Sequence, residues 1–420
     1  MDKDGLLYKI KEGIHDMGYI WMQEIRLTVK DEGVLIFFIL VPFLYPLLYS
    51  WIYNNETVRE VPVAVVDLSH SKASREFIQR YDASPDVQVV AYCNSLDEAR
   101  TLVGKQTVRG ILLFPTDFSV QLHRMEQTTV SVYCDMSLML TYKAIYQSAT
   151  SVAQRTNRDI QITLSGNYTD RDDEVNTQPL AFEEVPIFNT TGGYGNFIIP
   201  AVLLLILQQT LLLGIGLSAG TSREHNRFRD LVPMVKHYKG IFRIVFGKSL
   251  CYFMIYTVIS AYLTLVVPRI FGFVSMTQPA DLTAFMLPYL LACIFFGMII
   301  SCLVRYRENI MLLVVFTSVP LLFLSGISWP QSSISGAWQG VSWIFPSTFG
   351  IRGFVRMNSM GATLNDIQPE YIALWIQAVV YLIVVCLLYR YQILRSRRHV
   401  LARLKQVKEK RANLTPTNAS

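Results

Sequence analysis

Six stretches of this sequence are long and apolar enough to cross a lipid bilayer, which takes about 20 residues of helix. Lipid offers no hydrogen-bond partners to the backbone, so each stretch is expected to be helical. The sequence therefore predicts a polytopic α-helical membrane protein with six transmembrane helices. The stretches are 34–53, 197–217, 250–267, 282–303, 310–329 and 372–389.

Composition agrees, because 51% of the 420 residues are hydrophobic and only 17% are charged, against about 25% charged in soluble domains. The net charge of +6 does not indicate nucleic acid binding, because the basic residues gather at the ends of the spans. The six cysteines show no C-x-x-C or His-paired spacing. No metal site is predicted.

The distribution of lysine and arginine predicts the orientation, because such residues resist translocation. The flanking segments on one side of the membrane carry 23 of them, against only Arg269, Arg352 and Arg356 on the other. Both termini, including the basic tail 390–420, are therefore expected in the cytoplasm. The long segment 54–196 is then extracytoplasmic, since long loops do not follow the charge rule.

The segment 54–196 predicts a small α/β domain inserted between the first two spans. β-Branched runs alternate with helical patterns that begin at serine N-caps, which argues for a mixed sheet with helices packed on it. Cys93 and Cys134 end two of the runs. Outside the cytoplasm they could form a disulfide, and two buried free thiols are the alternative. The runs are 61–69, 87–93, 108–115 and 129–135, and the helices are 71–82, 95–105 and 139–162.

Residues 1–33 predict an amphipathic helix along the inner leaflet. Its apolar positions recur at intervals of three and four: Ile10, Ile14, Met17, Trp21 and Ile25. A helix packed on a soluble domain is the alternative, but the sequence offers no cytoplasmic domain large enough.

Two loops favour roles beyond anchoring. The cytoplasmic loop 218–249 mixes both charges with apolar residues, which is typical of a docking helix, although an ordinary positively charged loop fits too. The outer segment 330–371 and the residues before it are rich in proline, glycine and tryptophan, which predicts a re-entrant hairpin or an aromatic belt. Within the second span, Gln208 and Gln209 are expected to bond to a neighbouring helix.

Gly247-Lys248-Ser249 has the ending of a nucleotide-binding P-loop, G-x-x-x-x-G-K-[ST]. The early glycine would have to stand at position 242, where the residue is Phe242. No nucleotide site is predicted, so the chain is not expected to be an ATPase. If ATP drives its function, another chain must bind it.

The order of several motifs resembles the transmembrane subunits of type-2 ABC export systems. Gln23-Glu24 and Lys30-Asp31 fit the family's entrance helix, and the family's R-E-x-x-G-T loop aligns with 223–227, where Asn226-Arg227 replaces Gly-Thr. Two outer signatures align with 324–330 and 341–348, with Ile334-Ser335 in place of the usual Met-Pro.

The resemblance implies three sets of functional residues. The residues that would couple to the ATPase are Arg223, Glu224, His225, Arg227, Phe228 and Leu231. Those of the interfacial helix are Trp21, Glu24, Arg26 and Asp31. Those of an exit gate are Leu324, Ser325, Gly326, Pro330, Trp343, Pro346 and Thr348.

The resemblance also implies a half-transporter in the bacterial cytoplasmic membrane that exports an amphipathic, lipid-like or drug-like substrate. Its partners would be ABC ATPase subunits that hold ATP and Mg²⁺, a second copy or a paralogue, membrane lipids and a periplasmic adaptor. No cofactor is expected on this chain.

Two other classes of protein were weighed. A membrane-anchored sensor needs only one or two spans, and a membrane-embedded enzyme normally places Asp, Glu or His within the spans. The six predicted spans contain none of these residues. The exporter is therefore favoured.

Overall fold

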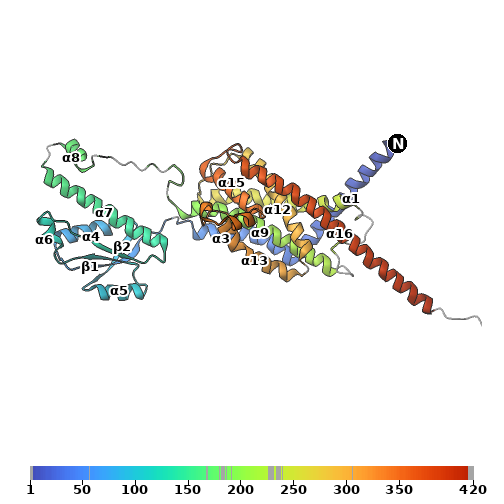
Figure 1. Cartoon of the computed structure of the whole chain (residues 1–420), viewed down its shortest axis with the longest axis horizontal. Coiled ribbons are helices and arrows are strands. Elements are labelled where there is room, and N and C mark those ends of the chain that lie inside the picture. The colour runs from blue at the N-terminus through green and yellow to red at the C-terminus, as the bar shows by residue number, and fades with distance from the viewer. Residues whose placement is uncertain are drawn as a thin grey trace, which may run out of the picture. The chain divides into compact units, whose positions relative to one another are not determined.

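The computed structural model describes residues 3–55, 57–166, 169–178, 180, 185, 187–190, 192–225, 231–232, 238, 240–304 and 306–414. The chain divides into two compact units (Figure 1). We call Asn55–Ile187 the α/β unit, and Met1–Asn54 together with Phe188–Ser420 the helical unit.

The helical unit holds six helices that are long and apolar enough to cross a membrane, at 32–52, 194–224, 241–271, 279–303, 307–324 and 368–399. Each predicted apolar stretch overlaps one of them. The elements of this unit are α1 Lys3–Lys30, α2 Glu32–Leu35, η1 Ile36–Leu40, α3 Val41–Ile52, α9 Tyr194–His225, α10 Ile241–Ala261, η2 Tyr262–Val266, α11 Val267–Phe271, α12 Pro279–Leu303, α13 Arg307–Leu324, η3 Gln331–Ser333, α14 Gly336–Ser342, α15 Pro346–Met360 and α16 Gln368–Leu414.

Several helices run beyond the apolar stretches that predicted them. α9 continues to His225 and α10 begins at Ile241, so the expected loop 218–249 is shorter at both ends. α16 continues to Leu414, well past the expected end of the last span at Tyr389. Hydrophobicity marks the part of a helix that suits lipid, whereas helix formation continues into polar residues of good propensity.

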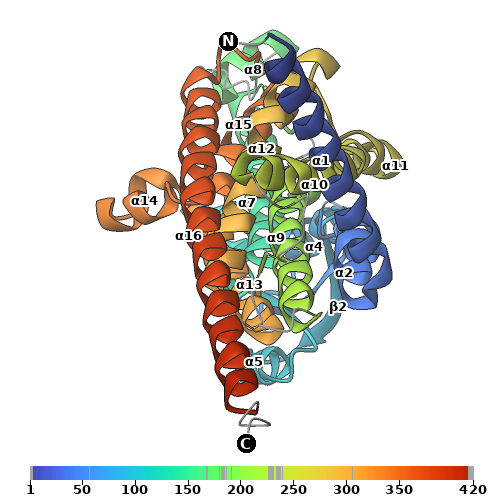
Figure 2. The same ribbon diagram turned by 90° about the vertical axis from the view of Figure 1, so that its right-hand side faces the viewer.

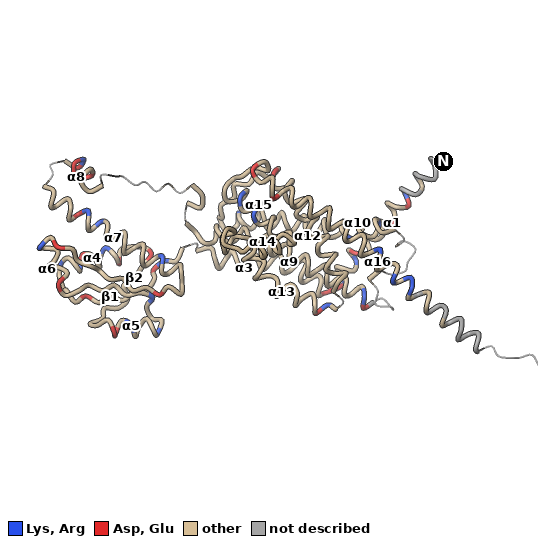
Figure 3. The backbone as a smooth tube through the Cα atoms, in the orientation of Figure 1, with Lys and Arg blue, Asp and Glu red and all other residues tan. Residues whose placement is uncertain are grey.

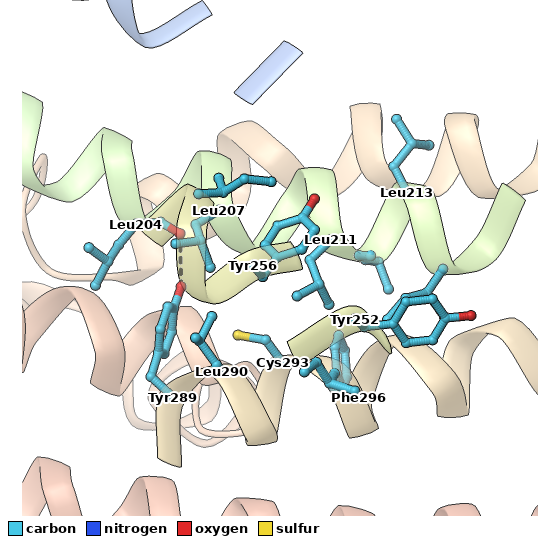
Figure 4. Close-up of a cluster of buried hydrophobic side chains, with 14 of the residues drawn as sticks. Leu204, Leu207, Leu211, Leu213, Tyr252, Tyr256, Tyr289, Leu290, Cys293 and Phe296 are labelled. Carbon is cyan, nitrogen blue, oxygen red and sulfur yellow. Dashed lines mark hydrogen bonds between the residues drawn. The ribbon is translucent and has the colours of Figure 1, made fainter. Parts of the chain in front are cut away.

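The helical unit is built around α9. Its apolar stretch is 100% buried, whereas that of α13 is only 17% buried. α9 contacts α12, α13 and α15. Figure 4 shows part of this core, where the Tyr289 hydroxyl of α12 donates to the Leu204 carbonyl of α9 at 2.8 Å. The bond satisfies the one polar group of a buried tyrosine.

The α/β unit contains a four-stranded sheet with the order β2-β1-β3-β4. β1 pairs in parallel with both β2 and β3, and β3 pairs antiparallel with β4. Its elements are β1 Val61–Asp67, α4 Lys72–Asp82, β2 Val87–Cys93, α5 Leu96–Gly104, β3 Gly110–Phe114, α6 Phe118–His123, β4 Ser131–Cys134, α7 Met139–Ser165 and α8 Asp170–Thr177.

Helices cover both faces of this sheet (Figure 1). α4, α6 and α7 pack on one face around Val63, Val65 and Phe77, and α5 packs on the other around Ala64 and Val66. The predicted N-caps hold, because Ser71 accepts from the backbone of Ser74 and Ser95 from that of Glu98. Strands and helices therefore lie close to their predicted bounds.

The disulfide considered between Cys93 and Cys134 is not formed, since both are free thiols. They end β2 and β4, the two edge strands of the sheet. Three strand spacings separate those edges, or about 14 Å, whereas bridged cysteines need Cα atoms within about 7 Å. Burial raises the pKa of both thiols, helped at Cys93 by the charge of Glu98.

A first prediction concerns Gly214 in the middle of α9. A methyl group on Gly214 would overlap the ring of Phe38 from the first span, so Gly214→Ala should destabilise the protein by about 1–3 kcal/mol. The measurement is the melting temperature of the detergent-purified chain. Gly18→Ala is the matched control, since no described heavy atom lies within 4 Å of the added carbon; it should melt no lower than the wild type. Equal melting of the two variants would contradict the packing of Phe38 on α9.

Candidate functional site

The buried face of α1 differs from the predicted apolar stripe. Ile14, part of that stripe, is 62% exposed, whereas Asp16, Ile20, Glu24 and Thr28 are buried. These four recur at every fourth position, which is one face of a helix, and α1 packs on α10. The predicted stripe was assigned to the lipid surface, so this second, polar face of α1 was not predicted. Polar residues with partners on other helices can be buried.

Glu24 and Lys248 form a buried ion pair between α1 and α10. The Nζ of Lys248 lies 2.8 Å from Oε2 of Glu24, and the side chains are 5% and 0% exposed. The other oxygen, Oε1, accepts from the Ser218 hydroxyl of α9 at 3.2 Å and from the Tyr252 hydroxyl of α10. One carboxylate thus joins three helices.

Gly247 allows this pair to form. A Cβ at position 247 would lie 2.9 Å from the side chain of Ile20, so only glycine lets α1 approach α10 this closely. The next residue, Lys248, is then brought within reach of Glu24. Gly247-Lys248 therefore packs two helices together. Both residues lie within α10, which begins at Ile241, earlier than the predicted span 250–267.

A second polar cluster is centred on Asp31. Its carboxylate caps α2 by accepting from the backbone of Gly33 at 3.0 Å and of Val34 at 3.2 Å, and it also accepts from the Thr221 hydroxyl. Nη2 of Arg307 lies 3.0 Å from Oδ1. Burial pushes the pKa of Asp31 up, but the bonds from Thr221, Val34 and Arg307 outweigh it and lower the pKa below the usual value.

Arg307 also reaches the predicted coupling residue Glu224. Its Nη1 lies 3.9 Å from Oε2 of Glu224, whose side chain is 61% exposed. Arg307 therefore stands between a partly buried carboxylate just before the first span and an exposed one at the end of α9. In the sequence, Arg307 contributes only a charge that sets orientation, because nothing in its neighbourhood signals a distant partner.

Arg223 closes the end of α12. Its guanidinium donates to the carbonyls of Ser301 at 2.9 Å and Cys302 at 3.2 Å, and also to that of Val304. These carbonyls have no partner within the helix, and a cation is favoured at this negative end. Arg223 is accordingly only 7% exposed.

The structure corrects one predicted coupling residue. Leu231, expected on a face offered to a partner, is 1% exposed and belongs to the hydrophobic core. Arg227 and Phe228 lie outside the described residues, as does the side chain of His225, whose backbone is within α9. Of the interfacial set, Trp21 is half-buried and Arg26 exposed.

The predicted exit-gate residues lie around short helices instead of in one simple hairpin. Leu324 ends α13, Gly326 has a left-handed φ of 90°, and Pro346 begins α15. α14 extends to one side of α16 in Figure 2 and contacts α13. Exposed Pro330 precedes η3, and Trp343 follows α14 with 56% exposure.

Polar side chains of α9, α15 and α16 hold this region in place. Gln377 of α16 donates to the Trp343 carbonyl at 2.7 Å, and Arg352 donates to that of Ser325 at 3.1 Å. Oε1 of Gln208 in α9 accepts from the Ser347 backbone at 2.6 Å, as the expected interhelical bond. The buried Thr348 hydroxyl donates to the Ser342 carbonyl at 2.7 Å.

Charged residues of the helical unit gather at the helix ends, and the middles of the helices are almost free of them (Figure 3). Within the described ranges, no three His, Cys, Asp or Glu residues come together to hold a metal ion. The chemistry of the site is therefore that of ion pairs and helix caps. We call the Glu24 and Asp31 clusters together the polar belt: Glu24, Asp31, Ser218, Thr221, Glu224, Lys248, Tyr252 and Arg307.

A second prediction tests the buried pair. Lys248→Met leaves Glu24 buried without its cation and should lower stability by about 3–5 kcal/mol. Adding Glu24→Gln should recover most of that loss, because no unpaired charge then remains. Melting temperatures of the two single variants and the double variant measure the coupling. Lys30→Met, at an exposed position on α1, should melt like the wild type, and additive losses in the double variant would contradict the pair.

A comparison with protein families identifies one family for this chain. The family model described as ABC-2 family transporter protein matches residues 33–387, well over half of the chain. No curated protein matches the sequence. The match spans all six candidate membrane helices, apart from the last turns of α16, so the chain is a multi-pass membrane protein. It belongs to the ABC-2 transporter family and is a transmembrane subunit of an ABC transporter.

Proposed function

We propose that this chain is the permease subunit of an ATP-driven exporter and that the polar belt couples ATP hydrolysis to the membrane helices. The observation that carries the proposal is Arg307, which bridges exposed Glu224 and partly buried Asp31. A protein that binds at Glu224 acts on the first span through one side chain.

The coupling would work by displacing packed helices as rigid bodies. A pull on the end of α9 is passed through Arg307 to the N-cap of α2, and through Arg223 to the last carbonyls of α12. Ser218 passes the same displacement to Glu24 and α1. Packed helices tend to switch between discrete arrangements, so these contacts would move α9, α1 and α12 together.

The power source would be a separate ABC ATPase, which holds ATP and Mg²⁺ on its own chain. The failed P-loop spacing at Gly247-Lys248 supports this division, as does the family, whose members generally work with such a partner. α13 buries only 17% of its apolar stretch within this chain. A second copy or a paralogue, and membrane lipids, would cover the rest.

The substrate would be amphipathic, lipid-like or drug-like, since the middles of the spans are almost free of charged residues (Figure 3). The outer helices α14 and α15 would gate its exit. The positive-inside distribution supports cytoplasmic termini in a bacterial cytoplasmic membrane. The α/β unit would then lie outside, where a periplasmic adaptor could bind it.

A third prediction tests the coupling. Glu224→Arg places a second cation beside Arg307. It should lower the amount of ATPase recovered with the permease, and the vanadate-sensitive ATP hydrolysis of the sample, at least about tenfold. The assay is purification from the native membrane in mild detergent, with mass spectrometry of what accompanies the chain. Glu308→Arg is the matched control, because Glu308 is exposed beside Arg307 in sequence and stands outside the polar belt. Failure to recover any ATPase with the wild type, with none captured by crosslinking in cells, would sink the proposal.

A fourth prediction tests the orientation. An epitope inserted after Lys105, in the turn that follows α5, should bind antibody in intact spheroplasts. An epitope appended after Ser420 should bind only once the membrane is opened with detergent. The opposite pattern would place the α/β unit in the cytoplasm and reverse the proposed direction of transport.

A further inference from the structure

β2 is an edge strand of the α/β unit, since β1 is its only neighbour in the sheet. Its sequence, VQVVAYC, contains no charge and no proline, the two usual means by which an edge is protected from pairing with another chain. Val90 and Tyr92 are 48% and 70% exposed. This edge is therefore chemically suited to accept a further strand.

A bulge changes the face toward which the end of β2 points. Val63 pairs with Val89, but the next residue, Ala64, pairs with Ala91, so Val90 is the extra residue. Val87 packs in the core under α4 and α7, whereas Cys93 packs in the core under α5. Because neighbours in a strand alternate between faces, Tyr92 is turned to the α4 side.

A depression with a volume of about 430 Å³ lies at this place, between the end of β2 and α4. Buried Val65 and Ile78 contribute apolar surface, and Tyr92, Arg75, Gln79 and His70 line it as well. All of these residues belong to the α/β unit. A hollow between an edge strand and a helix is the place where an added strand would insert alternate side chains.

The depression has a cation, Arg75, that could bind an anionic side chain. Asp67 is the only acid that lines it within the described range 57–166, and its oxygens already accept from the Ser69 and His70 backbones, each at 3.0 Å, and from the Ser74 hydroxyl at 2.7 Å. Arg75 is held by the carbonyls of Ser71 at 3.2 Å and His70 at 3.1 Å, through Nε and Nη2. Within the described part of the α/β unit no contact is recorded for Nη1 of Arg75, so this nitrogen can donate to a carboxylate.

The edge is open only beside the depression. Asp82 accepts from the Val89 backbone at 2.7 Å, and Glu98 accepts from that of Asn94 at 2.9 Å. Within the described part of the α/β unit, no side chain is recorded bonding to the backbone of Val90 or Tyr92. The stretch available for pairing is therefore Val90–Cys93, which adjoins Arg75.

We propose that Val90–Cys93 and the adjoining depression form a docking site for an extended, acidic peptide segment of a partner protein. The segment adds as a strand to β2 through its backbone and places a carboxylate on Arg75. Backbone pairing supplies the affinity in such complexes, and the pocket for a side chain supplies the specificity. The site does not depend on the proposed transport function.

The experiment is a selection from a displayed library of random octapeptides on the full-length chain in nanodiscs. Enriched peptides should combine β-branched residues with Asp or Glu, and each is resynthesised with a fluorophore for anisotropy. Arg75→Ala should weaken their binding at least about tenfold, and peptides with Gln or Asn for the acid should lose as much on the wild type. Arg124→Ala, at an exposed arginine elsewhere on the unit, should bind like the wild type.

A second variant keeps the test decisive if Arg75→Ala disturbs the loop. Tyr92→Glu adds a negative charge beside Arg75 at an exposed position of the edge. It should repel an acidic segment and abolish binding while far-UV circular dichroism stays unchanged. An empty selection overturns the proposal, as does enrichment that is indifferent to both variants. If small carboxylates such as benzoate bind at Arg75 while no peptide does, the depression is a small-molecule site and the proposal is likewise wrong.

Discussion

The buried contact between Glu24 and Lys248 is the constraint on which the arrangement of the helical unit depends. A charge removed from water is tolerated only beside an opposite charge and hydrogen-bond donors, and here those come from two helices far apart in the sequence. Few positions of α1 on α9 and α10 can satisfy the carboxylate. Apolar packing alone would allow α1 to slide, whereas the ion pair fixes its register.

The same physical rule operates at the neighbouring helix ends. A helix leaves its last carbonyls and first amides without internal partners, and here they are satisfied by residues of other elements. Arg223 of α9 serves the end of α12, and Gln208 of α9 serves the start of α15. Because α9 provides both side chains, hydrogen bonds as well as apolar packing hold α9 to the end of α12 and to the start of α15.

Local signals explain what could be predicted from the sequence. Serine N-caps at Ser71 and Ser95, β-branched runs and apolar stretches act within a few residues, so the strands, the helices and the six spans were predictable. The polar belt was not, because the role of Arg307 depends on Asp31, 276 positions away. For the same reason the polar face that α1 buries against α10 was not predicted. Its deciding partner, Lys248, lies on another helix.

α16 is one continuous helix, so movement at one of its ends can be transmitted to the other. Its 47 residues span about 70 Å at 1.5 Å per residue, more than twice the apolar thickness of a bilayer. Gln377 and Tyr381, in the N-terminal part of α16, donate to the carbonyls of Trp343 and Ile344, which lie between α14 and α15. A tilt of about 5° around the midpoint would move each tip by about 3 Å. A displacement of the basic C-terminal part of α16 would therefore move its N-terminal part, and with it Trp343 and Ile344, in the opposite direction.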